Sequence, residues 1–156
     1  MARTPDTDKT PAGAAGEFDP LRLDLQLCFA LYSAANKVTR LYRPILEPLG
    51  LTYPQYLAMM ALWEESPRTV GALGEALGLD SGTLTPLLKR LEGQGLVERA
   101  RDPADERRVT VSLTGEGAAL KARAAHVPAA LACQLGCDLA EIADLRDRLK
   151  RFVERI

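Results

Sequence analysis

Residues 80–91 read Asp-Ser-Gly-Thr-Leu-Thr-Pro-Leu-Leu-Lys-Arg-Leu, and the fold of the chain can be worked out from this stretch. Its leucines recur at the three- and four-residue spacing of a helix: Leu84, Leu87, Leu88 and Leu91. They predict a short helix with one buried stripe. Its first turn carries the hydroxyls of Ser81, Thr83 and Thr85, and short hydrogen-bonding side chains on an exposed first turn suit a DNA major groove. Because Ser and Thr also cap ordinary helices, the flanking segments decide whether this is a recognition helix.

The chain before this stretch predicts two more helices. Thr69 can cap a short helix over 70–77, which Gly78 ends. Two short helices joined by a tight turn that contains glycine are the helix-turn-helix arrangement. Earlier still, residues 52–55 read Thr-Tyr-Pro-Gln and match a capping box, which predicts a helix from there to about Glu65.

The chain after the stretch carries the most specific signal. Gly93 and Gly95 end the helix, and residues 96–100 and 107–113 then read as two strands around a turn-rich segment. Two strands with a polar tip, directly after a helix-turn-helix, predict a winged helix. Residues 89–108 hold six basic and five acidic side chains, so the competing interpretation is a solvated hairpin with internal ion pairs.

The charges of this hairpin suggest a specific geometry at its tip. Asp102 and Asp105 can orient the guanidinium of Arg107, and an arginine at a wing tip can enter a DNA minor groove. The whole chain has a formal charge of −1, so any DNA-binding face must be local.

The first helix and its end are predicted from apolar spacing and from helix breakers. Apolar residues from Leu21 to about Leu46 follow helical spacing, and Pro44, Pro48 and Gly50 break this helix. Residues 1–19 show no periodicity and predict a disordered tail.

The C-terminal third predicts helices that need a partner. Thr114 caps an alanine-rich helix, which Pro128 interrupts near His126 and Gly136 ends. Residues 138–141 cap a last helix. Its apolar face consists of Leu139, Ile142, Leu145, Leu149, Phe152, Val153 and Ile156. Helices this amphipathic predict packing against the first helix of the same or another subunit.

Composition limits the compartment and the redox state. No apolar run reaches the roughly 18 residues that a membrane span needs, and the N-terminus lacks a hydrophobic signal core. We therefore expect a cytoplasmic protein whose three cysteines, Cys28, Cys133 and Cys137, start as thiols.

The run Asp-Pro-Ala-Asp-Glu-Arg-Arg at 102–108, closed by Leu113-Thr114, resembles the wing signature of the MarR family of bacterial winged-helix repressors. The match spans roughly residues 21–154. The resemblance implies a mainly α fold with a small β-hairpin wing and a homodimer on double-stranded operator DNA. It implies a winged helix-turn-helix lobe over 51–114 and a helical dimerisation platform over 20–50 and 115–156. The matching DNA-contacting positions are Ser81, Thr83, Thr85 and Arg90, with Asp105 and Arg107 in the wing.

The first cysteine suggests how DNA binding is controlled. Cys28 and Tyr42 lie 14 residues apart on one helix, or about 21 Å, so they cannot touch within a chain. Two such helices packed antiparallel across a dimer axis could bring Cys28 beside Tyr42 of the other subunit. Hydrogen bonds from Tyr42 and Tyr53 would favour the thiolate, which is the form that attacks a peroxide.

Cys28, Tyr42, Tyr53 and Cys133 together resemble the organic hydroperoxide resistance regulators (the OhrR group) of that family. The resemblance implies that an organic hydroperoxide oxidises Cys28, the peroxidatic cysteine, and that Cys133 of the other subunit, the resolving cysteine, forms a disulfide with it. Cys137, one helical turn beyond Cys133, is an alternative resolver.

Two other functions compete with this hypothesis. A repressor of the same family could sense a small phenolic or anionic ligand, with Cys28 inert. A thiol peroxidase or hydrolase could use Cys28 with His126, the single histidine. The lack of a nucleophile loop, a phosphate loop and a metal-ligand spacing argues against an enzyme. No metal or cofactor is expected.

Overall fold

The structure is a computed structural model that describes residues 19–102 and 105–156, and it divides into two compact units, residues 1–35 and 36–156. Apart from Asp19, the predicted tail lies outside the described residues. The first unit holds the 3-10 helix η1 (Leu23–Leu25) and the start of helix α1 (Leu27–Leu46). The prediction of one helix from Leu21 is therefore wrong at its start. Gln26 has an extended backbone conformation with ψ of 120°, which separates η1 from α1.

The end of α1 also differs from the prediction. Pro44 lies inside α1 and does not break it. Proline lacks an N–H, but two residues from the helix end this removes a single hydrogen bond, which the packing of Ile45 and Leu46 in the core offsets. The 3-10 helix η2 (Glu47–Leu49) follows, and Gly50 ends it at a φ of +69°.

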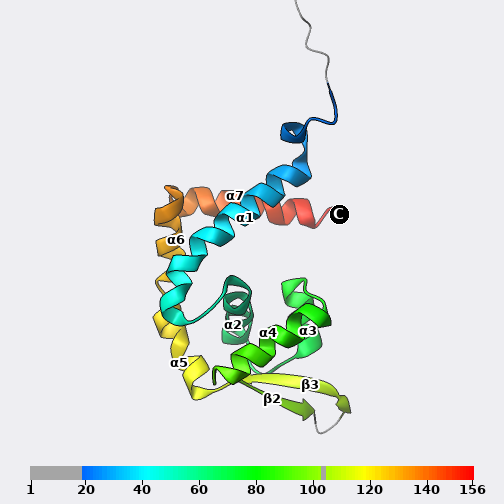
Figure 1. The fold of residues 1–156 in the computed structure, drawn as a ribbon, viewed down its shortest axis with the longest axis vertical. Coiled ribbons are helices and arrows are strands. Elements are labelled where there is room, and N and C mark those ends of the chain that lie inside the picture. Colours follow the sequence, from blue (N-terminus) through cyan, green and yellow to red (C-terminus); the bar gives the residue numbers. More distant parts are fainter. Residues whose placement is uncertain (1–18, 103–104) are drawn as a thin grey trace, which may run out of the picture. The chain divides into compact units, whose positions relative to one another are not determined.

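The second unit contains the winged helix-turn-helix that the sequence predicted (Figure 1). Its helices are α2 (Tyr53–Glu64), α3 (Val70–Leu77) and α4 (Ser81–Gly93). The caps form as expected: the Gln55 side chain accepts a hydrogen bond from the Thr52 N–H at 2.8 Å, and Thr69 accepts one from the Ala72 N–H at 3.1 Å. All four leucines of the α4 stripe are buried.

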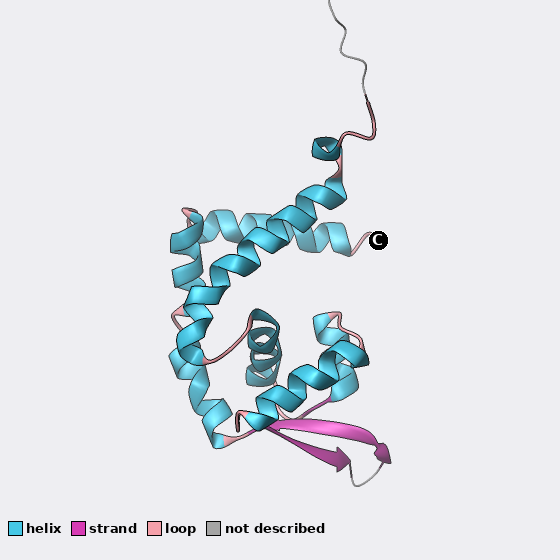
Figure 2. Ribbon diagram, viewed as in Figure 1, coloured by secondary structure: helices cyan, strands magenta, loops and turns pink. Residues whose placement is uncertain are grey.

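The wing is part of a three-stranded antiparallel sheet in the order β1–β3–β2 (Figure 2). Strands β2 (Val97–Asp102) and β3 (Asp105–Leu113) form the hairpin, with a register shift between Arg101 and Asp102. Strand β1 (Arg68–Thr69), which was not predicted, pairs with β3 just before α3 begins. Two residues are too short to show an alternating pattern, so the sequence carries no signal for this strand.

Three helices complete the second unit: α5 (Gly115–Ala124), α6 (Val127–Leu135) and α7 (Leu139–Val153). The predicted interruption near His126 is confirmed, since Pro128 lies in the first turn of α6. Much of the predicted apolar face of α7 is exposed in the single chain, including Leu145 and Leu149. Among the described residues, no helix is both long enough and apolar enough to cross a membrane.

Candidate DNA-binding face and thiol site

The recognition helix α4 begins at a strong cap. Asp80 accepts hydrogen bonds from the Thr83 N–H at 2.8 Å and from the Thr83 hydroxyl at 3.2 Å. The bond from the Thr83 N–H is the main reason why the pKa of Asp80 lies below its usual value. Because the Thr83 hydroxyl donates its proton to Asp80, its oxygen is left as a hydrogen-bond acceptor on the exposed first turn of α4. Ser81 and Arg90 are exposed, and Thr85 is half-buried.

The wing tip has the geometry that its charges suggested. Asp105 accepts hydrogen bonds from the backbone N–H of Arg107 at 3.1 Å and from its Nε at 3.2 Å. The Arg107 side chain nevertheless stays 92% exposed. Asp105 therefore orients the guanidinium of Arg107 through its Nε and leaves the two Nη atoms to face a binding partner. Asp102 lies opposite Asp105 in the strand register, and its role in orienting Arg107 stays a prediction.

A concavity of about 420 Å³ lies between the recognition helix and the wing, lined by Thr69, Thr85, Arg99, Arg107 and Arg108 among others. Sequence reasoning missed Arg99, although it follows buried Val97 by two residues and so lies on the same face of β2. The alternation of buried and exposed residues along β2 was the sequence signal that could have identified Arg99.

The two tyrosines of the predicted sensor lie together in the second unit. The ring centroids of Tyr42 and Tyr53 are 4.6 Å apart, and the ring centroid of Tyr56, which sequence reasoning did not place at this site, lies 6.0 Å from that of Tyr42. Burial, with the neighbouring phenols adding to it, raises the pKa of Tyr42 to about 12. Burial also raises the pKa of Tyr53. Tyr42 and Tyr53 therefore stay neutral phenols, able to donate hydrogen bonds, at physiological pH.

The Tyr42→Phe variant is expected to lose less stability than the wild type as the pH rises from 10 to 12. The folded pKa of Tyr42, about 12, exceeds the ordinary value of 10.0, so the unfolded chain loses the proton first. The stability linked to this group is fully present below pH 10 and is lost as pH rises towards 12. Urea unfolding at several pH values measures the difference, and parallel curves for the two proteins would contradict the assignment.

The three cysteines are all exposed. Cys28 belongs to the first unit and the tyrosines to the second, so their contact across a dimer stays a prediction. Cys133 lies on α6. The expectation that Cys137 follows one helical turn later is wrong, because Gly136 ends α6 at a φ of +64°. Cys137 lies in the loop before α7, where its thiol donates to the Leu135 carbonyl at 3.5 Å.

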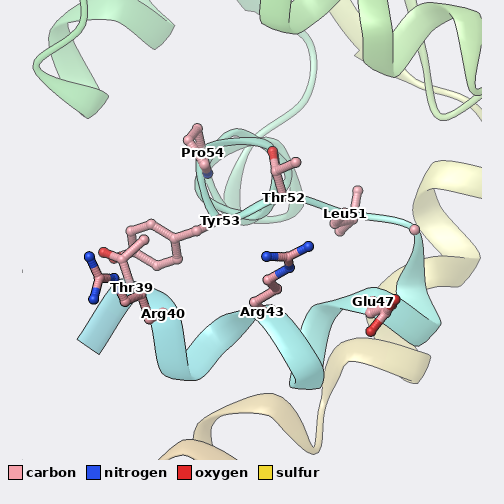
Figure 3. A pocket seen from close by; sticks show the side chains of 9 residues that line it. Thr39, Arg40, Arg43, Glu47, Leu51, Thr52, Tyr53 and Pro54 are labelled. Carbon is pink, nitrogen blue, oxygen red and sulfur yellow. The ribbon is translucent and has the colours of Figure 1, made fainter. Parts of the chain in front are cut away.

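Two cavities flank Tyr53. One, of about 630 Å³, is lined by α1 residues such as Arg40 and Arg43 and by the start of α2 (Figure 3). The other, of about 1010 Å³, is a largely apolar groove along α7 that Cys137 also lines. Among the described residues, no cluster of His, Cys, Asp and Glu side chains could hold a metal ion.

A helix-turn-helix with an exposed polar first turn and an arginine-tipped wing defines a winged-helix DNA-binding regulator. Comparison with known proteins agrees. The family model described as transcriptional regulator SarA/Rot matches residues 40–123. The chain is 50% identical to the organic hydroperoxide resistance transcriptional regulator of Bacillus subtilis, over 81% of this chain and 88% of that protein. It is 48% identical to the regulator TtmR of Methylorubrum extorquens, over 90% of this chain and 72% of that protein.

Solved structures extend the comparison. Reduced AbfR bound to DNA matches with a TM-score of 0.69 at 35% identity, over 85% of this chain and 92% of that one. PcaV of Streptomyces coelicolor, in complex with its natural ligand, matches with a TM-score of 0.74 at 26% identity, over 87% and 97%. The chain belongs to the MarR/SarA family of winged-helix transcriptional regulators. It is a DNA-binding transcriptional regulator.

Proposed function

We propose that this chain is a redox-sensing repressor that binds a pseudo-palindromic operator as a homodimer and is released when an organic hydroperoxide oxidises Cys28. The observation that carries the proposal is the 50% identity to the Bacillus subtilis organic hydroperoxide resistance regulator. The exposed thiol of Cys28 and the paired rings of Tyr42 and Tyr53 support it.

The homodimer is supported by the apolar surface of the single chain. Leu145, Leu149 and Val153 of α7 are exposed and line the groove beside Tyr53. Contiguous apolar surface of this kind marks an interface, and a second copy of the chain would bury it by two-fold symmetry. Two lobes held in this way would place their α4 helices in successive major grooves and their wings in the flanking minor grooves.

The proposed chemistry takes place in two steps in the reducing cytoplasm. The Cys28 thiol attacks the hydroperoxide, its O–O bond breaks, and the products are a sulfenic acid and an alcohol. The thiol of Cys133 from the other subunit then attacks the sulfenic sulfur, and a disulfide and water form. The bond would draw α6 of one subunit towards α1 of the other and rotate the lobes away from the spacing of the half-sites.

A gel and a binding assay test this proposal together. The operator is first selected from random duplexes by the reduced protein. After cumene hydroperoxide, the wild type is expected to leave the operator and to run as a linked dimer on a non-reducing gel, whereas Cys133→Ser stays unlinked. A linked dimer in Cys133→Ser but not in Cys137→Ser would make Cys137 the resolver. Oxidised wild type that remains on the operator would contradict the redox mechanism.

A specific observation favours a second candidate, a repressor released by a small anionic or phenolic ligand. The guanidinium groups of Arg40 and Arg43 line the cavity of about 630 Å³, and Thr52 and Tyr53 line it from the start of α2 (Figure 3). Arginine guanidiniums bind carboxylates well, and the cavity has the volume of a small-molecule site. Release of the Cys28→Ser variant from DNA by salicylate, used as the probe, would favour this candidate.

A further inference from the structure

An ion pair between Glu92 and Arg99 joins the recognition helix to the wing. Arg99 of β2 donates to the same carboxylate oxygen of Glu92 through Nε at 2.9 Å and Nη2 at 2.6 Å. The Arg99 side chain is 23% exposed and that of Glu92 is 38% exposed, so the pair is partly shielded from solvent. Two hydrogen bonds of this length fix the direction of the guanidinium more strongly than a single hydrogen bond does.

The position of Glu92 makes the pair unusual for a helix end. Glu92 lies in the last turn of α4 (Ser81–Gly93), where the helix dipole disfavours a negative charge. Arg99 compensates: its hydrogen bond is the main reason why the pKa of Glu92 is lowered. A carboxylate at this end is also unfavourable for a protein that must approach phosphates. Glu92 therefore calls for an explanation other than the stability of the helix.

The surroundings of Arg99 supply that explanation. Its side chain lines the concavity that Thr85 of the recognition helix and Arg107 and Arg108 of the wing also line. A phosphate of bound DNA that enters this concavity meets the highly exposed guanidiniums of Arg107 and Arg108. Arg99 would add a third positive charge, but Glu92 holds its guanidinium. Phosphate contacts strengthen binding to every sequence, so each cation withheld lowers non-specific affinity.

We propose that Glu92 is a specificity-determining residue, which withholds Arg99 from the DNA backbone and uses it to fix the angle between the recognition helix and the wing. The proposal rests on the proposed function, since it concerns discrimination between the operator and other DNA. In the wild type Arg99 is a positioning residue and contacts no phosphate.

The Glu92→Gln variant tests the proposal. Its affinity for a scrambled duplex is expected to rise about five-fold at low salt, and its log–log salt dependence to steepen by about 0.9, which corresponds to one additional phosphate contact. On the selected operator the same gain is offset by the loosened angle between α4 and β2. The ratio of operator affinity to scrambled affinity is therefore expected to fall by about the same five-fold factor.

Three further variants separate this role from general effects. Glu98→Gln removes the same charge from the opposite face of β2, where Glu98 is exposed, and is expected to leave the affinity ratio unchanged. Arg99→Ala is expected to weaken operator binding with the wild-type salt dependence. In the double variant Glu92→Gln/Arg99→Ala, the additional salt dependence of Glu92→Gln is expected to disappear. Thermal unfolding of each variant checks that it is folded.

Several results would overturn the proposal. One is that Glu92→Gln weakens both duplexes equally with unchanged salt dependence, as expected for a purely structural pair. Another is that Arg99→Ala reduces the salt dependence by about one contact, which would make Arg99 a phosphate ligand already. If the wild type binds the selected operator no more tightly than the scrambled duplex, the proposed function itself fails. If the wild type discriminates and Glu92→Gln discriminates equally well, this inference alone fails.

Discussion

The Cys28→Ser variant is expected to stay on operator DNA at cumene hydroperoxide concentrations that release the wild type. Typical coupling free energies of 1–3 kcal/mol correspond to a loss of affinity of about 5- to 150-fold when the wild type is oxidised. A serine hydroxyl does not attack the O–O bond, so the variant should show none of this loss. Titration of labelled operator, followed by fluorescence anisotropy before and after oxidation, measures the operator affinity of both proteins.

The matched control for this prediction is Cys133→Ser, which keeps the first thiol and loses the proposed second one. Oxidised Cys133→Ser should react with a dimedone-type probe of sulfenic acid, and Cys28→Ser should not. If hydroperoxide releases Cys28→Ser from the operator as strongly as it releases the wild type, Cys28 is not the sensor. The position of Cys137 in a loop, after α6 has ended, makes a separate test of that thiol necessary.

The Gly117→Ala variant is expected to lose about 3 kcal/mol of folding free energy, at the upper end of the usual cost of overpacking. Gly117 is buried in the first turn of α5, and a Cβ there would collide with the Leu96 carbonyl oxygen. That oxygen cannot easily move, since it accepts a hydrogen bond from the Thr114 N–H at 3.1 Å. The Gly117 carbonyl accepts a further bond from the Trp63 indole at 2.8 Å, so a shift of α5 would disturb α2 as well.

Gly115→Ala is the control for this prediction. It places the same methyl group two residues earlier in α5, where no atom lies within 4 Å. Alanine is a better helix former than glycine, so this variant should be as stable as the wild type or more stable by up to about 1 kcal/mol. Urea unfolding at one fixed protein concentration compares the three proteins. A loss below about 0.5 kcal/mol in Gly117→Ala would contradict the close contact, because surface substitutions produce changes of that size.

The candidate site was predicted unevenly. The recognition helix, the wing and the contact between Asp105 and Arg107 follow from local sequence, because a cap, a stripe and a turn each involve residues close in the chain. The Glu92–Arg99 pair and the Trp63–Gly117 hydrogen bond were missed. The partners of the second bond are 54 residues apart, and no local pattern indicates which distant groups will meet.

The sequence by itself determined the winged helix-turn-helix and the starts of several helices of this protein. The spacing of Leu84, Leu87, Leu88 and Leu91 defines the buried face of the recognition helix, and Thr69, Asp80, Thr114 and Asp138 define where helices begin. These features are local, and their energies depend on neighbours within one or two turns. Only the tertiary structure decided that the rings of Tyr42 and Tyr53 lie against each other, that the Trp63 indole meets the Gly117 carbonyl, and that Glu92 holds Arg99 beside the wing. Those outcomes depend on how packed elements meet, because the free energy of a contact between two elements exists only after the core has brought them together.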